Sequence, residues 1–276
     1  MGLSRLTKVT TALKANALEL AIFTGHLILY PSGIVAERPG PAPADADADD
    51  DGDTSPSPRP KPANGAGRPV VLLHGFVDNR SVFVLLRRSL LRHGRRPVES
   101  FNYSPLTFDL RAAAELLGRH VERLCARTGH HEVDLVGHSL GGLIARYYVQ
   151  RLGGDTRVRT LVMLGTPHAG TTAAPWAGAH PLVRQMRPGS DVILELAEPA
   201  AGCRTRCVSF WSDLDQVMVP VETARLDHAD LRVHNVQVSG IGHLALPVHP
   251  TVAAGIREAL DADDGAAAEP GAASVA

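Results

Sequence analysis

Gly137-His138-Ser139-Leu140-Gly141 is a G-x-S-x-G sequence that lies between two runs of different character. The residues before it, 133–136, form a short and mostly apolar run that indicates a strand, and the residues after it, 142–149, indicate a helix. A strand that turns at once into a helix needs glycines on both sides of the bend, where they let the backbone expose a serine hydroxyl at the tip. The helix N-terminus also offers unpaired N–H groups that favour nearby negative charge. The stretch therefore predicts that Ser139 is a nucleophile.

From residue 69 onward the chain alternates predicted strands with predicted helices. Strands are expected at 70–73, 98–103, 133–136, 158–164, 208–211 and 233–238, and helices at 81–92, 108–127, 143–151 and 251–260. This alternation predicts an α/β fold in which a mostly parallel sheet carries helices on both faces.

A nucleophilic serine needs a base to accept its proton and an acid to orient that base. When the serine lies on such a turn, the acid and then the histidine follow it along the chain, in loops at the carboxyl ends of strands. We expect the base to be His243, because its loop follows the last predicted strand and contains two glycines. His234 lies inside that strand and His249 lies between prolines, so both fit less well.

Two aspartates compete for the role of the acid. Asp213 and Asp215 both follow the strand predicted at 208–211 and precede a Val-Pro pair. A buried carboxylate in this loop would hold the tautomer of the imidazole and stabilise the imidazolium.

Two backbone N–H groups are needed to bind the oxyanion of the transition state. We expect one from Leu140, directly after the nucleophile, and the other from Phe76, in the loop that follows the first strand. His74 in the same loop is interpreted as a support for the loop.

Taken together, these motifs resemble those of bacterial lipases and esterases of the α/β-hydrolase family, in particular its triacylglycerol-lipase-like branch. The resemblance covers residues 69–260 and rests on the segments 71–76 (VLLHGF), 137–146 (GHSLGGLIAR), 164–171 (LGTPHAGT) and 240–243 (GIGH). It implies an α/β-hydrolase fold. The acid of such lipases commonly stands in a D-x-x-V-x-P or similar context, which selects Asp215 and gives a triad of Ser139, Asp215 and His243. It also implies that His168 is structural or lines the pocket.

The chain differs from larger lipases between residues 171 and 203, where only short elements are expected and a large helical lid is not. Esterase activity on shorter or soluble acyl esters is therefore compatible with the resemblance. Apolar residues in this region are candidates for an acyl groove, although core packing explains them nearly as well: Trp176, Leu182, Val183, Met186, Ile193 and Leu194.

The domain expected at 69–261 is flanked by segments of different composition. Residues 1–36 place Arg5, Lys8 and Lys14 before an apolar stretch, which fits a leader peptide, an anchor, or an amphipathic helix on the domain or at a membrane surface. Residues 37–68 are rich in Pro, Ala and Asp and predict a disordered linker, and residues 262–276 predict a disordered tail.

Bulk properties exclude several function classes. A net charge of -1 leaves no basic footprint for nucleic acid. The three cysteines, Cys125, Cys203 and Cys207, have no further ligands at zinc-site spacing, so a small Cys203–Cys207 disulfide or free thiols are favoured over a metal.

We expect the protein to need no cofactor and to be a monomer. A secreted or membrane-associated location is favoured by residues 1–36, with the cytoplasm left open.

The sequence thus predicts a serine carboxylic-ester hydrolase that acts on an acyl ester or lipid through an acyl-enzyme on Ser139. An acyltransferase or thioesterase with the same triad is the alternative, because the choice of acceptor depends on pocket shape. A membrane-tethered binding protein without catalysis is a third interpretation, since a fold does not dictate a function.

Overall fold

The computed structural model of the protein describes residues 17–25, 28–29, 31, 67–76, 78–93, 96–103, 109–173, 178–262 and 273–275. Most of the expected linker and tail lies outside these residues, as does Trp176. Within the described part of the chain, no helix combines the length and the apolar character that a membrane crossing needs.

A parallel sheet forms the centre of the molecule. Its strands lie in the order β2-β1-β3-β4-β5-β6-β7, and every neighbouring pair is parallel. They are β1 (Val70–Leu73), β2 (Val98–Phe101), β3 (Val133–His138), β4 (Val158–Leu164), β5 (Arg206–Ser212), β6 (Arg232–Val238) and β7 (Ala273–Val275). The six predicted strands are all present. The last strand was not expected, because residues 273–275 belong to the segment predicted to be a disordered tail.

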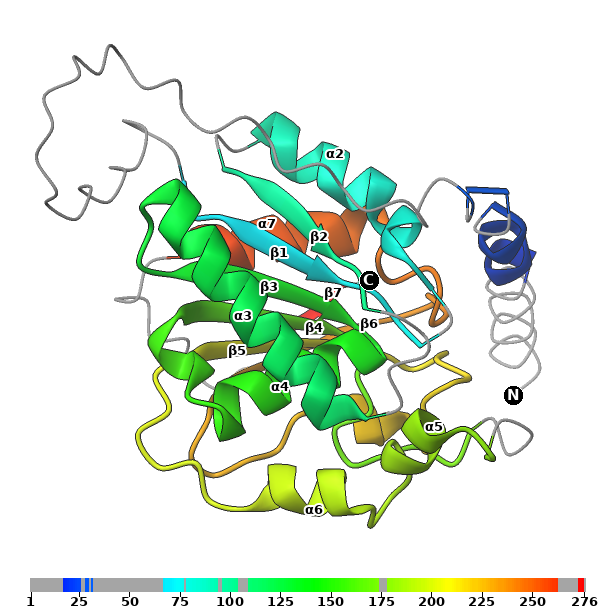
Figure 1. Ribbon diagram of the computed structural model, residues 1–276. Helices are drawn as coiled ribbons and strands as arrows, with labels where there is room; N and C mark the ends of the chain where they lie inside the picture. The colour runs from blue at the N-terminus through cyan, green and yellow to red at the C-terminus, as the bar shows by residue number, and fades with distance from the viewer. Residues whose placement is uncertain are drawn as a thin grey trace, which may run out of the picture.

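Helices cover both faces of this sheet (Figure 1). They are α2 (Val84–His93), α3 (Leu110–Thr128), α4 (Leu140–Arg151), α5 (Pro181–Gln185), α6 (Asp191–Ala197) and α7 (Pro250–Asp261), together with the short 3-10 helices η1 (Arg80–Phe83), η2 (Gly154–Thr156) and η4 (Val221–Ala224). Between Thr171 and Cys203 the described residues contain only the two short helices α5 and α6, as the sequence predicts.

Successive side chains of each strand point to opposite faces of the sheet, so the core consists of two clusters, one on each face. In β1, Val71 and Leu73 pack with α3 and α4, whereas Val70 and Leu72 pack with α2 and α7 on the opposite face. All four side chains are fully buried, as expected for a central parallel strand with helices on both sides.

Because all strands run in the same direction, the loops after them meet at one edge of the sheet. The loops after β1, β3, β5 and β6 carry, in that order, the expected oxyanion, nucleophile, acid and base residues. In Figure 1 the blue helical segment at residues 17–25 lies beside this edge, far from the strand starts.

Candidate active site

Ser139 occupies the bend between β3 and α4 in a strained conformation. Its φ is 53° and its ψ is -120°, and no other non-glycine residue in the described ranges has a positive φ. Such a conformation costs about 1–3 kcal/mol and persists only where the surroundings enforce it. The surroundings here are tight: a Cβ at Gly141 would overlap the carbonyl oxygens of Leu73 and His74, and one at Gly142 would overlap Thr166 Oγ1. The strand-turn-helix predicted around Ser139 is present.

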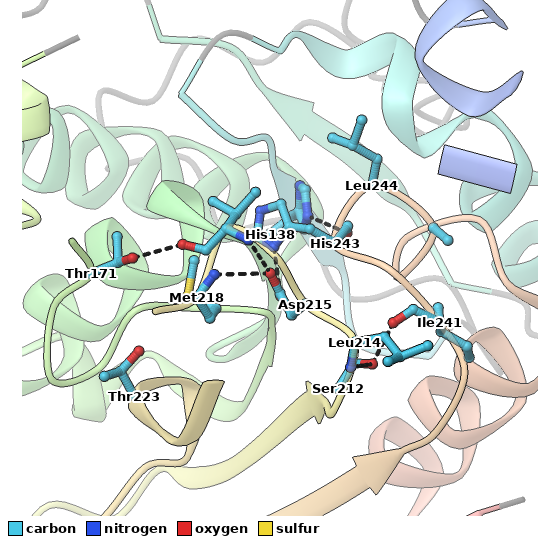
Figure 2. A network of polar contacts seen from close by, with 12 residues as sticks. His138, Thr171, Ser212, Leu214, Asp215, Met218, Thr223, Ile241, His243 and Leu244 are labelled. Carbon is cyan, nitrogen blue, oxygen red and sulfur yellow. Dashed lines mark hydrogen bonds and ion pairs between the residues drawn. The ribbon is translucent and has the colours of Figure 1, made fainter. Parts of the chain in front are cut away.

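His243 and Asp215 form a buried pair at the same edge of the sheet (Figure 2). His243 Nδ1 donates to Asp215 Oδ2 over 2.7 Å. The other carboxylate oxygen, Oδ1, accepts from the backbone N–H groups of Val217 at 2.9 Å and Met218 at 3.0 Å. This arrangement fixes the tautomer with the proton on Nδ1 and leaves Nε2 of His243 as the acceptor.

Charge and hydrogen bonding set the protonation of this pair. Burial opposes ionisation of Asp215, but the charge and hydrogen bond of His243 and the two backbone amides outweigh burial, so the pKa of Asp215 is lowered. Burial likewise disfavours a charged imidazole, yet the Asp215 carboxylate outweighs it and raises the pKa of His243 above 6.5. The pair therefore combines an ionised carboxylate with an imidazole that readily accepts a proton.

The two candidate aspartates lie in different surroundings. Asp213 is exposed, and its Oδ1 accepts from the backbone N–H of Gly240 at 3.2 Å. Asp215 is buried and bonded to His243. A hydroxyl links the two loops, since Ser212 Oγ donates to the Ile241 carbonyl and accepts from the Leu214 amide (Figure 2). The structure therefore brings Asp215, and not Asp213, to the expected base.

The two expected oxyanion donors lie on either side of Ser139. Leu140 is the first residue of α4, so its N–H has no partner within the helix. Phe76 belongs to the loop after β1, and that loop lies against the nucleophile, because a Cβ on Gly75 would be 3.5 Å from Ser139 Cβ. As expected of a supporting residue, His74 stacks on Tyr103 at 4.2 Å, and the Tyr103 hydroxyl donates to the His74 carbonyl over 2.7 Å.

His138 is a part of the site that the sequence motifs did not predict. Its ring lies 4.7 Å from that of His243, and its Nε2 is 3.2 Å from the His243 carbonyl oxygen. On the other side its Nδ1 is 3.7 Å from Asp78 Oδ2. The residue that precedes the nucleophile therefore packs against the expected base, and nothing in the five-residue motif specifies this contact.

Known proteins share this architecture. The sequence profile described as the alpha/beta hydrolase fold matches residues 68–191, which include Ser139 and the loop after β1. Over these residues the chain is similar to the alpha/beta hydrolase fold family, and its sheet and helices have that fold. The profile match ends before Asp215 and His243, so their assignment rests on the geometry above.

Individual proteins are similar to this chain in sequence or in fold. A triacylglycerol lipase of Pseudarthrobacter phenanthrenivorans is 32% identical over 114 residues, which make up 38% of this chain and 35% of that enzyme. The mature lipase BlEst2 of Bacillus licheniformis has a TM-score of 0.60 at 16% identity, over 74% of this chain and 96% of that one. Aspergillus fumigatus lipase B has a TM-score of 0.55 at 17% identity, over 66% and 47%. The sequence match thus spans about a third of the curated relative, and the structural matches show the fold alone.

His168 has a structural environment in this fold. Its Nε2 lies 3.1 Å from Ser209 Oγ, and its carbonyl accepts from buried Arg146 over 3.3 Å. Burial and the nearby Arg146 guanidinium hold the pKa of His168 well below its usual value, so the ring is neutral. These contacts lie within the fold, in agreement with the structural interpretation.

The residues expected to line an acyl groove pack mainly in the core instead. Leu182, Val183, Met186 and Ile193 are buried in the cluster beneath α3 and α4, and Leu194 is exposed. A cavity of about 400 Å³ reaches His243 elsewhere, between the helical segment 17–25 and the loops after β5 and β6. Its lining residues are Glu19, Leu20, Phe23, Leu214, Gln216, Val217, Gly242, His243 and Leu244.

The cysteines are separate thiols. Cys125 and Cys207 are buried and Cys203 is partly buried, and none of the three is in a disulfide. Burial raises the pKa of Cys207 to about 12, which makes it an unreactive thiol. Among the described residues, no three His, Cys, Asp or Glu side chains are grouped as a metal site would need.

Proposed function

We propose that this alpha/beta hydrolase is a serine carboxylic-ester hydrolase of the lipase or esterase type. The observation that carries the proposal is the 2.7 Å bond from His243 to Asp215 at the sheet edge where Ser139 stands at a positive φ. A hydroxyl on a strained turn, a histidine and a buried carboxylate are the three parts of a serine nucleophile system.

In the proposed mechanism, Ser139 Oγ attacks the ester carbonyl carbon while His243 Nε2 takes the hydroxyl proton. The amides of Leu140 and Phe76 bind the negative oxygen of the tetrahedral intermediate. The C–O bond to the alcohol then breaks, and His243 gives its proton to the departing alkoxide. Water, deprotonated by His243, attacks the acyl-enzyme and releases the carboxylic acid and Ser139. Asp215 stays ionised throughout, because its pKa is lowered.

The proposed substrate class is inferred from the cavity beside His243. Its walls include the apolar side chains of Leu20, Phe23 and Val217, and the described residues that line it include no lysine or arginine that would select an anionic substrate. An apolar acyl or alkyl chain suits such a cavity. The triacylglycerol lipase that matches over 114 residues is consistent with an ester substrate.

The test is hydrolysis of p-nitrophenyl esters of increasing acyl length by the wild type and by Ser139→Ala. We expect hydrolysis by the wild type and a loss of at least about 10³-fold in the variant, since the nucleophile and its proton transfer are both removed. A fluorophosphonate probe should label the wild type and leave Ser139→Ala unlabelled. Inactivity of the wild type on every ester, or full activity of the variant, would overturn the proposal.

A further inference from the structure

The helical segment at residues 17–25 contacts the loop that carries His243. Glu19 Oε2 accepts from the backbone N–H of Leu244 at 3.0 Å, and Glu19 Oε1 accepts from that of Ala245 at 2.9 Å. The partners are 225 and 226 residues apart in the chain. These two amides directly follow His243, at the start of a turn that continues to the His249 amide (Leu244 is labelled in Figure 2). The carboxylate therefore binds this turn as a capping side chain binds a helix N-terminus.

Gly242 provides the space for this contact. A Cβ at this position would overlap the Glu19 carboxyl group. The residue before His243 must therefore be small enough for the carboxylate to reach the two amides. A larger residue at position 242 would push the Glu19 carboxylate away from the two amides.

From these contacts we propose that Glu19 is a positioning residue for His243. By binding the amides of Leu244 and Ala245, it fixes the loop from which the imidazole donates to Asp215. The proposal rests on the proposed function for its kinetic readout, but the contact itself can be measured without any activity.

Four charged or titratable groups face the His243 ring, each from a different element. Asp215 comes from the loop after β5, His138 from the end of β3, Asp78 from the loop after β1, and Glu19 from the N-terminal helical segment. The carboxylates of Asp215, Glu19 and Asp78 all favour the imidazolium, and Asp215 has the largest effect. Removing the Glu19 charge therefore lowers the pKa of His243, whereas a contact of purely mechanical importance leaves that pKa unchanged.

The experiment compares Glu19→Ala and Glu19→Gln with the wild-type full chain. Glutamine keeps one oxygen acceptor for the two amides and loses the charge. We expect kcat on a p-nitrophenyl ester to fall roughly tenfold in Glu19→Ala and less in Glu19→Gln, with KM within about twofold, because loop position affects the transition state and leaves ground-state binding intact. The acid limb of the pH profile should move to lower pH by the same amount in both variants.

Two controls separate this role from a general effect on stability. Glu115→Gln makes the same chemical change on the exposed surface of α3, and Thr24→Ala alters an exposed position of the same helical segment. Both should keep the wild-type kcat and pH profile. Circular dichroism at the assay temperature verifies that all variants are folded.

A second measurement remains valid even if the wild type hydrolyses no ester. Hydrogen exchange at the Leu244 and Ala245 amides should accelerate at least about tenfold in Glu19→Ala, since both lose their acceptor, and the NMR titration of His243 should shift to lower pH. Unchanged exchange at these amides, or an unchanged kcat and acid limb in an active enzyme, would overturn the role of Glu19. Wild-type inactivity with accelerated exchange would overturn the proposed function and keep the contact.

Discussion

At the scale of single residues, the backbone strain at Ser139 lowers the stability of the fold. Its φ of 53° is a conformation that glycine adopts without strain. We predict that Ser139→Gly raises the free energy of unfolding by about 1 kcal/mol, because relief of about 1–3 kcal/mol of strain exceeds the added entropy of glycine in the unfolded chain. Urea denaturation measures this change. Ser139→Ala is the matched control, since it removes the hydroxyl but keeps the Cβ, and its stability should equal that of the wild type. Equal stability of both variants would mean that the turn is not strained.

The choice between the two aspartates is a second prediction at this scale. We expect Asp215→Asn to reduce kcat/KM by about 10²–10⁴-fold, because the imidazole loses the group that holds its tautomer. The residual activity should have its acid limb at lower pH, since the pKa of His243 is held above 6.5 by the Asp215 charge. Asp213→Asn changes an exposed side chain and should keep kcat/KM within about twofold of the wild type. A larger loss at Asp213 would contradict the assignment.

That Ser139, His243 and an aspartate lie at one edge of the sheet could be predicted, because each follows a strand and the carboxyl ends of parallel strands meet. The topology does not distinguish Asp215 from Asp213, which follows the same strand, so the choice of Asp215 came from the resemblance to lipases. Glu19 could not be predicted in this way, because its contact joins residues more than 200 positions apart, and no local pattern specifies it. The two glycines before His243 were used only to identify its loop. At Gly242, the structure shows instead that glycine leaves room for a carboxylate.

At the scale of elements, the periodic apolar patterns predicted where the helices lie. They did not predict which apolar side chains line a cavity. The helix predicted at 108–127 is present as α3, which is capped by Asp109, whose side chain accepts from the Arg111 amide at 2.9 Å, and which runs to Thr128. The apolar residues at 182–193 were considered for an acyl groove, but the same pattern also satisfies the core, and four of them are buried there. A pattern of apolar residues predicts which side chains are buried, but it does not predict which of them line a cavity.

The helical segment 17–25 makes a testable contribution to the cavity beside His243. Phe23 lines this cavity and is half exposed. We predict that Phe23→Ala shifts the preferred acyl length of p-nitrophenyl esters toward longer chains, because loss of the ring lengthens the cavity, and that it raises KM for short esters several-fold, since about 1 kcal/mol of apolar contact is lost. Leu116→Ala, at an exposed position of α3, is the control for loss of an exposed apolar side chain. An unchanged length profile in Phe23→Ala would place the acyl chain elsewhere.

At the scale of the whole molecule, the edge of the sheet opposite the site holds a buried charge that makes stability depend on pH. Asp134, near the start of β3, is fully buried, and its Oδ2 lies 3.6 Å from Arg68 Nε. Burial outweighs the nearby arginines and raises the pKa of Asp134 from 3.8 to about 6. The folded protein therefore binds more protons than the unfolded chain between these values, so this group lowers stability as pH rises through them.

Asp134→Asn should remove this dependence. We predict that the free energy of unfolding of the wild type, relative to Asp134→Asn, falls by about 2 kcal/mol between pH 4 and pH 6.5. Urea denaturation of both proteins across this range provides the measurement. A constant difference would mean that Asp134 is ionised throughout in the folded state.

The N-terminal segment and the sheet domain make separable contributions to stability and activity. Both core clusters consist of residues from the domain, and among the described residues before position 32 only Ile22 packs against one of them. We therefore predict that a chain lacking residues 1–31 still unfolds in one cooperative transition, with Tm lowered by no more than about 8 °C, because only about 1–2 kcal/mol of contact is lost. Its kcat should fall at least as far as that of Glu19→Ala, since the turn after His243 loses the same acceptor. Calorimetry and ester hydrolysis on the same preparation test both parts. A truncated chain that fails to fold would show that the segment is required for the core, and one with full kcat would show that the His243 loop holds its position unaided.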